Sequence, residues 1–182
     1  MTDNDRGCGH GFERAMWLGA GKFAKVVDLQ VTPKEHAVEV SYTYELPLPK
    51  QVTVQVTYLV DGTGKVNVNA KYPGHPDLPS LPTFGLEFKL PAKYDNMTYY
   101  GRGPAENYLD RKLGARLGTF TTTAKDSVAP YLVPQETGNH CDVRTLALTD
   151  DKEFGLKISA DKHAFSASLL PKALTLLLLT IL

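Results

Sequence analysis

The chain has few cysteines and no excess of either charge. Only two of its 182 residues are cysteine, Cys8 and Cys141, and they lie far apart. Two thiols in a chain of this size favour a reducing compartment over a disulfide framework, so we expect a cytoplasmic protein. Lys and Arg total 20, as do Asp and Glu, and the formal net charge is zero. This balance argues against binding to nucleic acid or to a membrane surface, because proteins that bind either partner usually carry an excess of basic residues.

The sequence also lacks the marks of a membrane span, a zinc finger or a nucleotide site. Its Leu-rich end, residues 174–182, has nine residues, whereas a spanning helix needs about 20. We expect that run to form a buried strand or helix. Cys8 and His10 resemble half of a zinc site, but no second pair follows at finger spacing. No glycine-rich phosphate loop is present. The sequence therefore predicts no metal and no cofactor in this chain.

Alternating polarity dominates the chain, and helical periodicity is nearly absent. The clearest alternation covers residues 37–46 and 51–60, followed by a Gly-containing turn at 61–64 and a partner strand at 65–72. This pattern predicts an antiparallel meander with one packed and one polar face. A helical turn at 13–18, with Trp17 as a packing residue, precedes it. After a proline-rich crossover, further strands are expected at 83–90, 98–100, 115–123, 142–149, 154–160 and 164–168. About ten short strands indicate a single all-β sandwich domain over residues 1–182.

Two polar segments interrupt the strand pattern, at residues 99–111 and 133–142. In the second, Glu136 and His140 are suitable as the base and the acid of proton transfer on a sugar. The alternative is that such side chains tie a loop to its neighbours by hydrogen bonds, and the residue types alone favour that alternative. A nucleophile pair of Cys141 with His140 is disfavoured, because neighbours on a strand point to opposite faces. Glu106 and Glu136 would form a glycosidase pair only if the two segments converge.

The charged residues of these segments also suit a structural clasp. Arginine binds carboxylates through two parallel hydrogen bonds, and Arg111 is expected to pair with Glu136 or Asp110. Sugar hydroxyl recognition is the functional alternative. The residues proposed for ligand binding or for the loop clasp are Arg102, Glu106, Asn107, Asp110, Arg111, Glu136, Asn139 and His140.

The same segments resemble a known family. Residues 101–111 read GRGPAENYLDR and are similar to the G-x-G-P-x-E-N-Y-x-D-R signature in the C-terminal domain of large β-galactosidases. Residues 133–139 resemble that family's P-Q-E-N-G-N segment, residues 2–7 its D-N-D-x-G run, and 165–168 a later strand. In two-subunit relatives the same region is the small chain. The resemblance implies an all-β, galactose-mutarotase-like antiparallel supersandwich, here truncated at its C-terminal end.

The resemblance also implies a division of labour. In this branch, family 2 of the glycoside hydrolases, the catalytic glutamates lie on a separate (β/α)8 barrel. A tryptophan late in the C-terminal domain reaches the active-site rim, and Trp17 does not match it. The parent enzymes hydrolyse terminal β-galactosides such as lactose and commonly use Mg and Na. The chain alone is thus expected to be inactive, with a catalytic barrel domain or large subunit as its partner.

Two further expectations remain at this stage. On the same fold, an autonomous aldose 1-epimerase could use Glu136 and His140. Missing strands at the C-terminal end would leave an open sheet edge and exposed apolar surface, so the chain is also expected to self-associate.

Overall fold

The computed structural model describes residues 7, 11–132, 136–161 and 163–170, and the backbone of 175–180. Residues 2–6, the Cys8–His10 pair and residues 133–135 of the second polar segment lie outside the described part. No helix among the described residues is long and apolar enough to cross a membrane. The chain divides into two compact units, Met1–Pro82 and Thr83–Leu182, which we describe separately as the N-terminal and C-terminal units. The prediction of a single domain stays a prediction.

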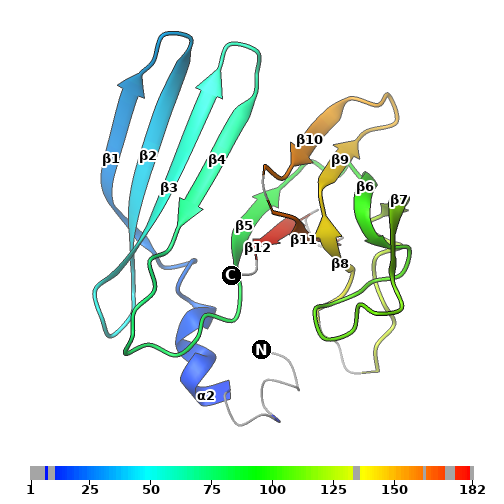
Figure 1. Cartoon of the computed structure of the whole chain (residues 1–182), viewed down its shortest axis with the longest axis horizontal. Helices are drawn as coiled ribbons and strands as arrows, with labels where there is room; N and C mark the ends of the chain where they lie inside the picture. Colours follow the sequence, from blue (N-terminus) through cyan, green and yellow to red (C-terminus); the bar gives the residue numbers. More distant parts are fainter. Residues whose placement is uncertain (1–6, 8–10, 133–135, 162, 171–174, 181–182) are drawn as a thin grey trace. The chain divides into compact units, whose positions relative to one another are not determined.

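The described part of the N-terminal unit includes a short helical segment from Gly11 to Leu18 and a four-stranded antiparallel meander (Figure 1). The helix α2 (Gly11–Arg14) continues into the 3-10 turn η1 (Ala15–Leu18), which confirms the predicted helical turn. Trp17 meets Tyr72 edge to face, with ring centroids 6.0 Å apart, and so has the predicted packing role. The four strands are adjacent in chain order: β1 (Lys25–Pro33), β2 (Ala37–Leu46), β3 (Val52–Asp61) and β4 (Val66–Lys71).

The strand register makes one face of this meander apolar across all four strands. In one row, Val31 pairs with Val40, Val40 with Tyr58, and Tyr58 with Val68. The next row of the opposite face is polar and consists of Thr32, Glu39, Leu59 and Asn67, with Leu59 as its one apolar member. Because side chains alternate between faces with a period of two, every such row follows from the sequence alternation. The predicted antiparallel meander is confirmed, but its apolar face is not packed throughout, since Val31 and Val66 are 60% and 47% exposed.

The C-terminal unit contains two four-stranded sheets, ordered β10-β9-β6-β7 and β5-β12-β11-β8. Neighbouring strands within both sheets pair antiparallel. Within the Leu-rich end, residues 175–180 form a strand between β5 and β11, and a strand was one of the two predicted alternatives. The strands are β5 (Phe84–Lys89), β6 (Asn96–Gly103), β7 (Arg116–Thr123), β8 (Asn139–Val143), β9 (Thr145–Thr149), β10 (Gly155–Ser159), β11 (Phe165–Leu170) and β12 (Thr175–Thr180).

Side chains from both sheets form the core of the C-terminal unit. One sheet contributes Met97 and Tyr99 on β6 with Leu146 and Leu148 on β9; the other contributes the residues Val143, Ala167 and Leu169. Each of these side chains is almost fully buried. Burial of a Val, Leu or Met side chain contributes about 1.5–3 kcal/mol, so this cluster is a main source of stability. The predicted all-β sandwich class is confirmed.

Two strand predictions were wrong in extent. The strand expected at residues 142–149 is two strands, β8 and β9, which belong to different sheets. Asp142 has a positive φ of 54°, which ends the regular extension, and the backbone N–H of Arg144 donates to the carbonyl of Tyr100 at 2.8 Å. The short strand expected at 98–100 is the eight-residue β6, so the start of the first polar segment lies inside a central strand.

Candidate functional site

The two polar segments converge in the C-terminal unit. The backbone N–H of Asn107 donates to the carbonyl of Asn139 at 2.8 Å, which joins the loop after β6 to the first residue of β8. The backbone N–H of Gly138 donates to Glu106 at 2.7 Å. The two segments therefore converge, which was the condition for Glu106 and Glu136 to act as a pair.

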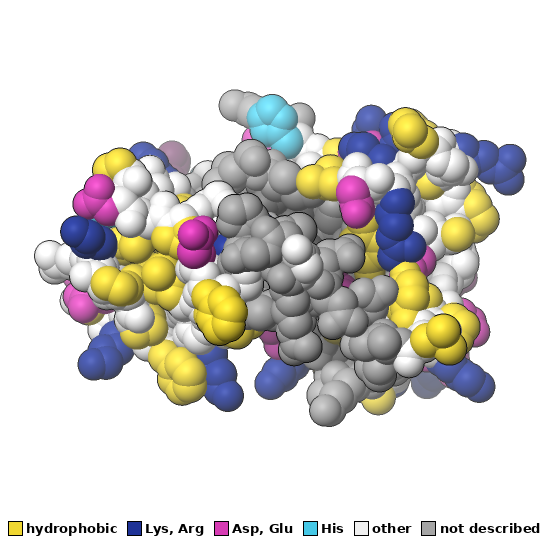
Figure 2. Space-filling model, turned by 90° about the horizontal axis from the view of Figure 1, so that it is seen from below, with side chains coloured by type: hydrophobic (Ala, Val, Ile, Leu, Met, Phe, Trp, Pro, Cys, Tyr) yellow, Lys and Arg dark blue, Asp and Glu magenta, His cyan; other side chains and the backbone are white. Residues whose placement is uncertain are grey.

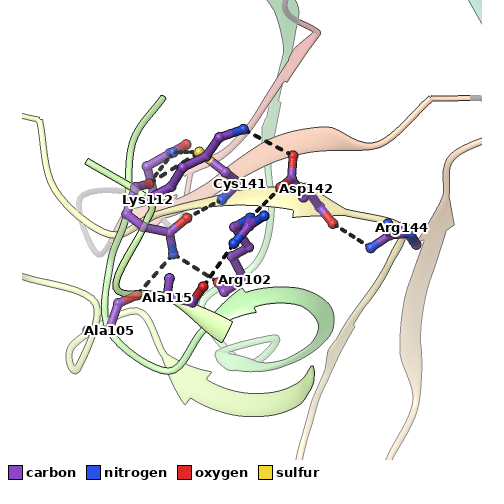
Figure 3. A network of polar contacts seen from close by, with 9 residues as sticks. Arg102, Ala105, Lys112, Ala115, Cys141, Asp142 and Arg144 are labelled. Carbon is purple, nitrogen blue, oxygen red and sulfur yellow. Dashed lines mark hydrogen bonds and ion pairs between the residues drawn. The ribbon is translucent and has the colours of Figure 1, made fainter. Parts of the chain in front are cut away.

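Asn107 stands at the centre of the junction and is 1% exposed. Its side-chain amide donates to the carbonyls of Arg102 at 2.9 Å and Ala105 at 3.1 Å, and its Oδ1 accepts from the Cys141 N–H at 2.9 Å (Figure 3). The Asn107 carbonyl accepts from Nδ2 of Asn139 at 2.7 Å. One buried amide thus satisfies three backbone groups that burial would otherwise leave unpaired.

Glu106 is engaged by donors from three places in the chain. Its carboxylate accepts from Arg111 at 2.9 Å, from the Tyr131 hydroxyl, and from the Gly138 N–H. Burial by itself would raise the pKa of Glu106, but hydrogen bonds from Tyr131, Gly138 and Arg111 outweigh it, and the pKa lies below its ordinary value. This carboxylate is ionised and fully used in holding the loops, so it is poorly placed to act as a proton donor.

The predicted partner of Arg111 was wrong. Its ion pair is with Glu106, at 2.9 Å, and not with Glu136 or Asp110. Its guanidinium also lies over the rings of Tyr108 and Tyr131, 4.4 and 5.6 Å from their centroids. The clasp is thus an arginine, a carboxylate and two tyrosines, and cation–π contact adds to the ion pair. Asp110 and Glu136 have exposed side chains.

Removal of the Arg111 guanidinium should weaken the C-terminal unit. We expect Arg111→Ala to lower the free energy of unfolding by about 1 kcal/mol, because the pair is half exposed but Glu106 loses a charged donor. Thermal unfolding followed by circular dichroism measures the change. The control is Arg116→Ala on β7, where the side chain is exposed and the melting temperature should hold. Equal melting temperatures for both variants would contradict the clasp.

A second charged cluster joins β6 to the end of β8. Nε of Arg102 donates to the carboxylate of Asp142, its terminal nitrogen donates to the carbonyl of Ala115 at 2.9 Å, and Lys112 lies 3.6 Å from the same carboxylate (Figure 3). The hydrogen bond from Arg102, followed by the charges of Lys112 and Arg102, outweighs partial burial and lowers the pKa of Asp142. The two cations hold Asp142 where the chain passes from one sheet to the other.

His140 is buried and faces the core. Its ring stacks on Tyr99 with centroids 4.3 Å apart, and its Nδ1 lies 2.9 Å from the Tyr99 hydroxyl. Burial lowers the pKa of His140 to about 4. The side chain is 3% exposed, so it is neutral at pH 7 and out of reach of a dissolved sugar. Cys141, the neighbouring residue, has its sulfur near the Asn107 carbonyl at 3.5 Å, so the two side chains have separate partners.

The glycines of both segments allow backbones to approach closely. A Cβ at Gly101 would lie 2.9 Å from Cγ2 and 3.0 Å from Cα of Val143. Gly138 has a φ of +72°, and a Cβ there would lie 2.7 Å from the carbonyl oxygen of Ser127. These positions need glycine because a side chain would meet main-chain atoms. The glycine spacing is therefore structural.

A metal does not fit the described part of this region. Among the described residues no group of three or more His, Cys, Asp or Glu side chains is placed to hold an ion. Glu106 and Asp142, two half-buried carboxylates of the two segments, face arginine and lysine donors. The divalent and monovalent cations implied by the family resemblance have no acidic site in these residues.

Several participants were not singled out from the sequence. Tyr99 and Tyr131 act through their hydroxyls, and Asp142 and Lys112 are two of the three charged residues of the second cluster. Asp142 is the last residue of the second segment and Lys112 directly follows the first. Their positions beside the motifs could therefore have identified both residues as participants. Tyr131 lies outside both segments, and nothing in the sequence connects it to Glu106.

Comparison with known proteins supports the family resemblance. The family described as "Beta galactosidase small chain" matches residues 1–175. The chain is 50% identical to the β-galactosidase BgaC of Bifidobacterium adolescentis over 97% of its own length, and 46% identical to the β-galactosidase of Streptococcus thermophilus over 93%. It spans only 17% and 16% of those proteins.

A shorter relative is covered more fully. The "Beta-galactosidase small subunit" of Latilactobacillus sakei is 34% identical over 93% of this chain, and the match spans 62% of that protein. The ordered motifs, the convergence of their loops in the structure and the match over residues 1–175 agree. The chain belongs to the β-galactosidase small chain family.

Proposed function

We propose that this chain is a non-catalytic domain of a β-galactosidase, which it completes by packing against a larger part that carries the catalytic glutamates. The chain matches about a sixth of the length of full-size relatives, and one relative is named as a small subunit. On this proposal the whole enzyme hydrolyses terminal β-galactosides such as lactose, and this domain stabilises it and borders its sugar site.

The use of the polar residues supports a structural role. Glu106 accepts three hydrogen bonds from within the unit, Arg102 and Arg111 are paired, and His140 is buried against Tyr99. An epimerase needs a base and an acid that reach a sugar at the surface. Glu136 is exposed but His140 is not, so the epimerase alternative is not favoured.

The finer parts of the proposal have separate support. Antiparallel sheets and a two-sheet core support a supersandwich in the complete domain. A buried free thiol at Cys141 suits a cytoplasmic enzyme. The lack of an acidic cluster in the described residues supports placing any Mg or Na site in the larger part.

Activity measurements test the proposal directly. The purified chain should not hydrolyse a chromogenic β-galactoside, while the full-length B. adolescentis enzyme, assayed in parallel, should. Polarimetry of freshly dissolved α-galactose should show no acceleration by the chain, and calorimetric titration with lactose tests sugar binding by the chain alone. Turnover by the chain at a rate near that of the full-length enzyme would overturn the non-catalytic role.

A further inference from the structure

One face of the β1–β4 sheet is buried at one end and open at the other. Near the start of β3, Val52 and Val56 on this face are 3% and 7% exposed. Toward the β1–β2 and β3–β4 turns, which Figure 1 draws at the upper end of the sheet, six large aliphatic residues are at least 38% exposed. We call them the apolar patch: Leu29, Val31, Val38, Val60, Val66 and Val68. Figure 2 shows hydrophobic side chains at the surface on the left of its view, the side on which Figure 1 draws this sheet.

The patch is continuous because the strand register aligns its members. Val38 pairs with Val60 and Val60 with Val66, while Val31 and Val68 are the two ends of a neighbouring row on the same face. No charged residue interrupts these rows. A surface that matches the patch must therefore be apolar and uncharged, since a charge placed against it would lose its water without gaining a partner.

Three tyrosines on the same face continue the patch and suit a protein interface. Tyr58 pairs with Val68 in one of its rows. Tyr42 stacks on Tyr44 with centroids 5.8 Å apart and meets Tyr58 edge to face at 6.1 Å. Aromatic residues held in place beside aliphatic surface are typical of interface centres.

The size of the patch argues against a pair of free chains. Four strands about 4.8 Å apart, with four to five residues each, present roughly 300 Å² of sheet, so covering the patch buries on the order of 600 Å² over both surfaces. A specific complex of free chains buries about 1,200 Å² or more, whereas parts of one polypeptide pack through about 600–1,500 Å². The self-association expected from the sequence stays a prediction, and through this patch alone it would be weak.

The C-terminal unit has no sheet face of comparable apolarity among its described side chains. Its two sheets pack their apolar faces on each other, through Tyr99 of one and Leu169 of the other. On β5, the side chains opposite the core-facing Phe88 include Glu87 and Lys89. The outer face of the β10-β9-β6-β7 sheet carries mainly hydroxyl groups, from Thr98, Tyr100, Thr119, Thr121, Thr145 and Thr149. The matching apolar surface is therefore expected outside this chain.

We propose that the apolar patch is a surface through which this chain packs against the larger part of a β-galactosidase. The inference rests on the proposed function and adds to it the face that makes the contact and the apolar, uncharged character of the surface opposite. The chain matches 17% of the B. adolescentis enzyme, so in that protein the rest of the same polypeptide is available to cover the patch. A covalent link supplies a high effective concentration, which lets an interface of this modest size stay closed.

Photo-crosslinking identifies what covers the patch. The test protein is a full-length chimera in which this chain replaces the matching part of the B. adolescentis enzyme, with p-benzoylphenylalanine in place of Val66. Under ultraviolet light the label should join a peptide of the larger part, identified by mass spectrometry. The matched control carries the label in place of Asn67, on the opposite face of the same strand, and should give little of that product.

Lysine variants compare the patch in the free chain and in the chimera. Val31→Lys with Val68→Lys should change the melting temperature of the free chain by no more than about 3 °C, because both side chains are already exposed. In the chimera the same pair should shorten the half-life of galactosidase activity at a fixed elevated temperature at least about tenfold, because two ammonium groups would be buried against apolar surface. Thr32→Lys with Asn67→Lys adds the same charge to the same outer strands on the polar face and should change neither quantity.

The outcomes separate this inference from the proposed function. An active chimera whose label joins only residues 83–182, only a second copy in a product of doubled mass, or nothing would overturn the inference and leave the proposed function in place. Equal half-lives for the patch and control variants would do the same. If the chimera is inactive, lysines at the two aligned positions of the B. adolescentis enzyme itself decide the matter by the same comparison of half-lives. Galactoside hydrolysis by the free chain would instead count against the proposed function.

Discussion

Replacement of Asn107 by alanine should be among the most destabilising single changes in the C-terminal unit. Three buried backbone groups depend on its amide: the carbonyls of Arg102 and Ala105 and the N–H of Cys141. A buried polar group that loses its partner costs about 1–3 kcal/mol. We expect Asn107→Ala to lower the free energy of unfolding by about 3–5 kcal/mol and the melting temperature by more than about 10 °C.

Two further variants make this result specific. Asn107→Asp preserves the shape and the acceptor for Cys141 but removes both donors and buries a charge, so it should be no more stable than Asn107→Ala. Asn69 is exposed on β4, so Asn69→Ala should change the free energy of unfolding by less than about 0.5 kcal/mol. Urea unfolding measures all three. A loss for Asn107→Ala as small as that for Asn69→Ala would show that the network contributes little.

Hydrogen exchange can locate the effect. The Cys141 N–H donates directly to Asn107, and the Asn107 N–H donates to the Asn139 carbonyl. In Asn107→Ala, peptides covering residues 99–111 and 136–149 should exchange faster than in wild type. Peptides from β1–β4 should retain their protection, since the network lies within the other unit.

The meander could be read from the sequence because its signals are local. Residues 37–46 alternate strictly, and β2 has those bounds in the structure; Gly64, at φ +85°, closes the predicted turn after β3. The same periodicity that predicts a strand also assigns each residue to a face. The apolar face of the N-terminal unit was therefore implied by the sequence before any tertiary contact was known.

The junction of the two polar segments could be predicted only in part. Composition indicated loops held by polar contacts, and Glu106, Asn107, Asn139 and Arg111 make contacts of that kind. The partners themselves depend on contacts between residues up to 41 positions apart. Arg111 has several carboxylates in reach along the chain, and only tertiary packing selects Glu106. The break between β8 and β9 was missed because the positive φ of Asp142 has no sign in a sequence of alternating polarity.

The burial of His140 should make the free energy of unfolding decrease as the pH falls from about 6.5 to about 4. In the folded chain burial lowers the pKa of His140 to about 4, and Tyr99 contacts its Nδ1 at 2.9 Å. In the unfolded chain the pKa returns to about 6.5. The unfolded state therefore binds more protons between these values, so the stabilising contribution is complete above about pH 6.5 and is lost as pH falls toward 4. The loss amounts to about 3 kcal/mol.

His140→Gln separates this effect from other titrations. Glutamine is always neutral and can accept from the Tyr99 hydroxyl, so its variant should lack the loss between pH 6.5 and 4. Glu106 and Asp142 have lowered pKa values and contribute equally in both proteins, mainly at still lower pH. His36→Gln, at a fully exposed turn, should retain the wild-type dependence. Urea unfolding at pH 7.5, 5.5 and 4.5 gives the comparison.

The protonation of His140 can also be followed at its own ring. In a histidine-selective NMR titration, the His140 signal should stay constant down to about pH 5, because burial lowers the pKa of its ring to about 4. A His140 midpoint near 6.5 in the folded chain would show that water reaches the ring. That result would return His140 to the set of residues available for acid–base chemistry. A low midpoint, together with the absence of the acid loss in His140→Gln, would establish that the imidazole beside Tyr99 is part of the core.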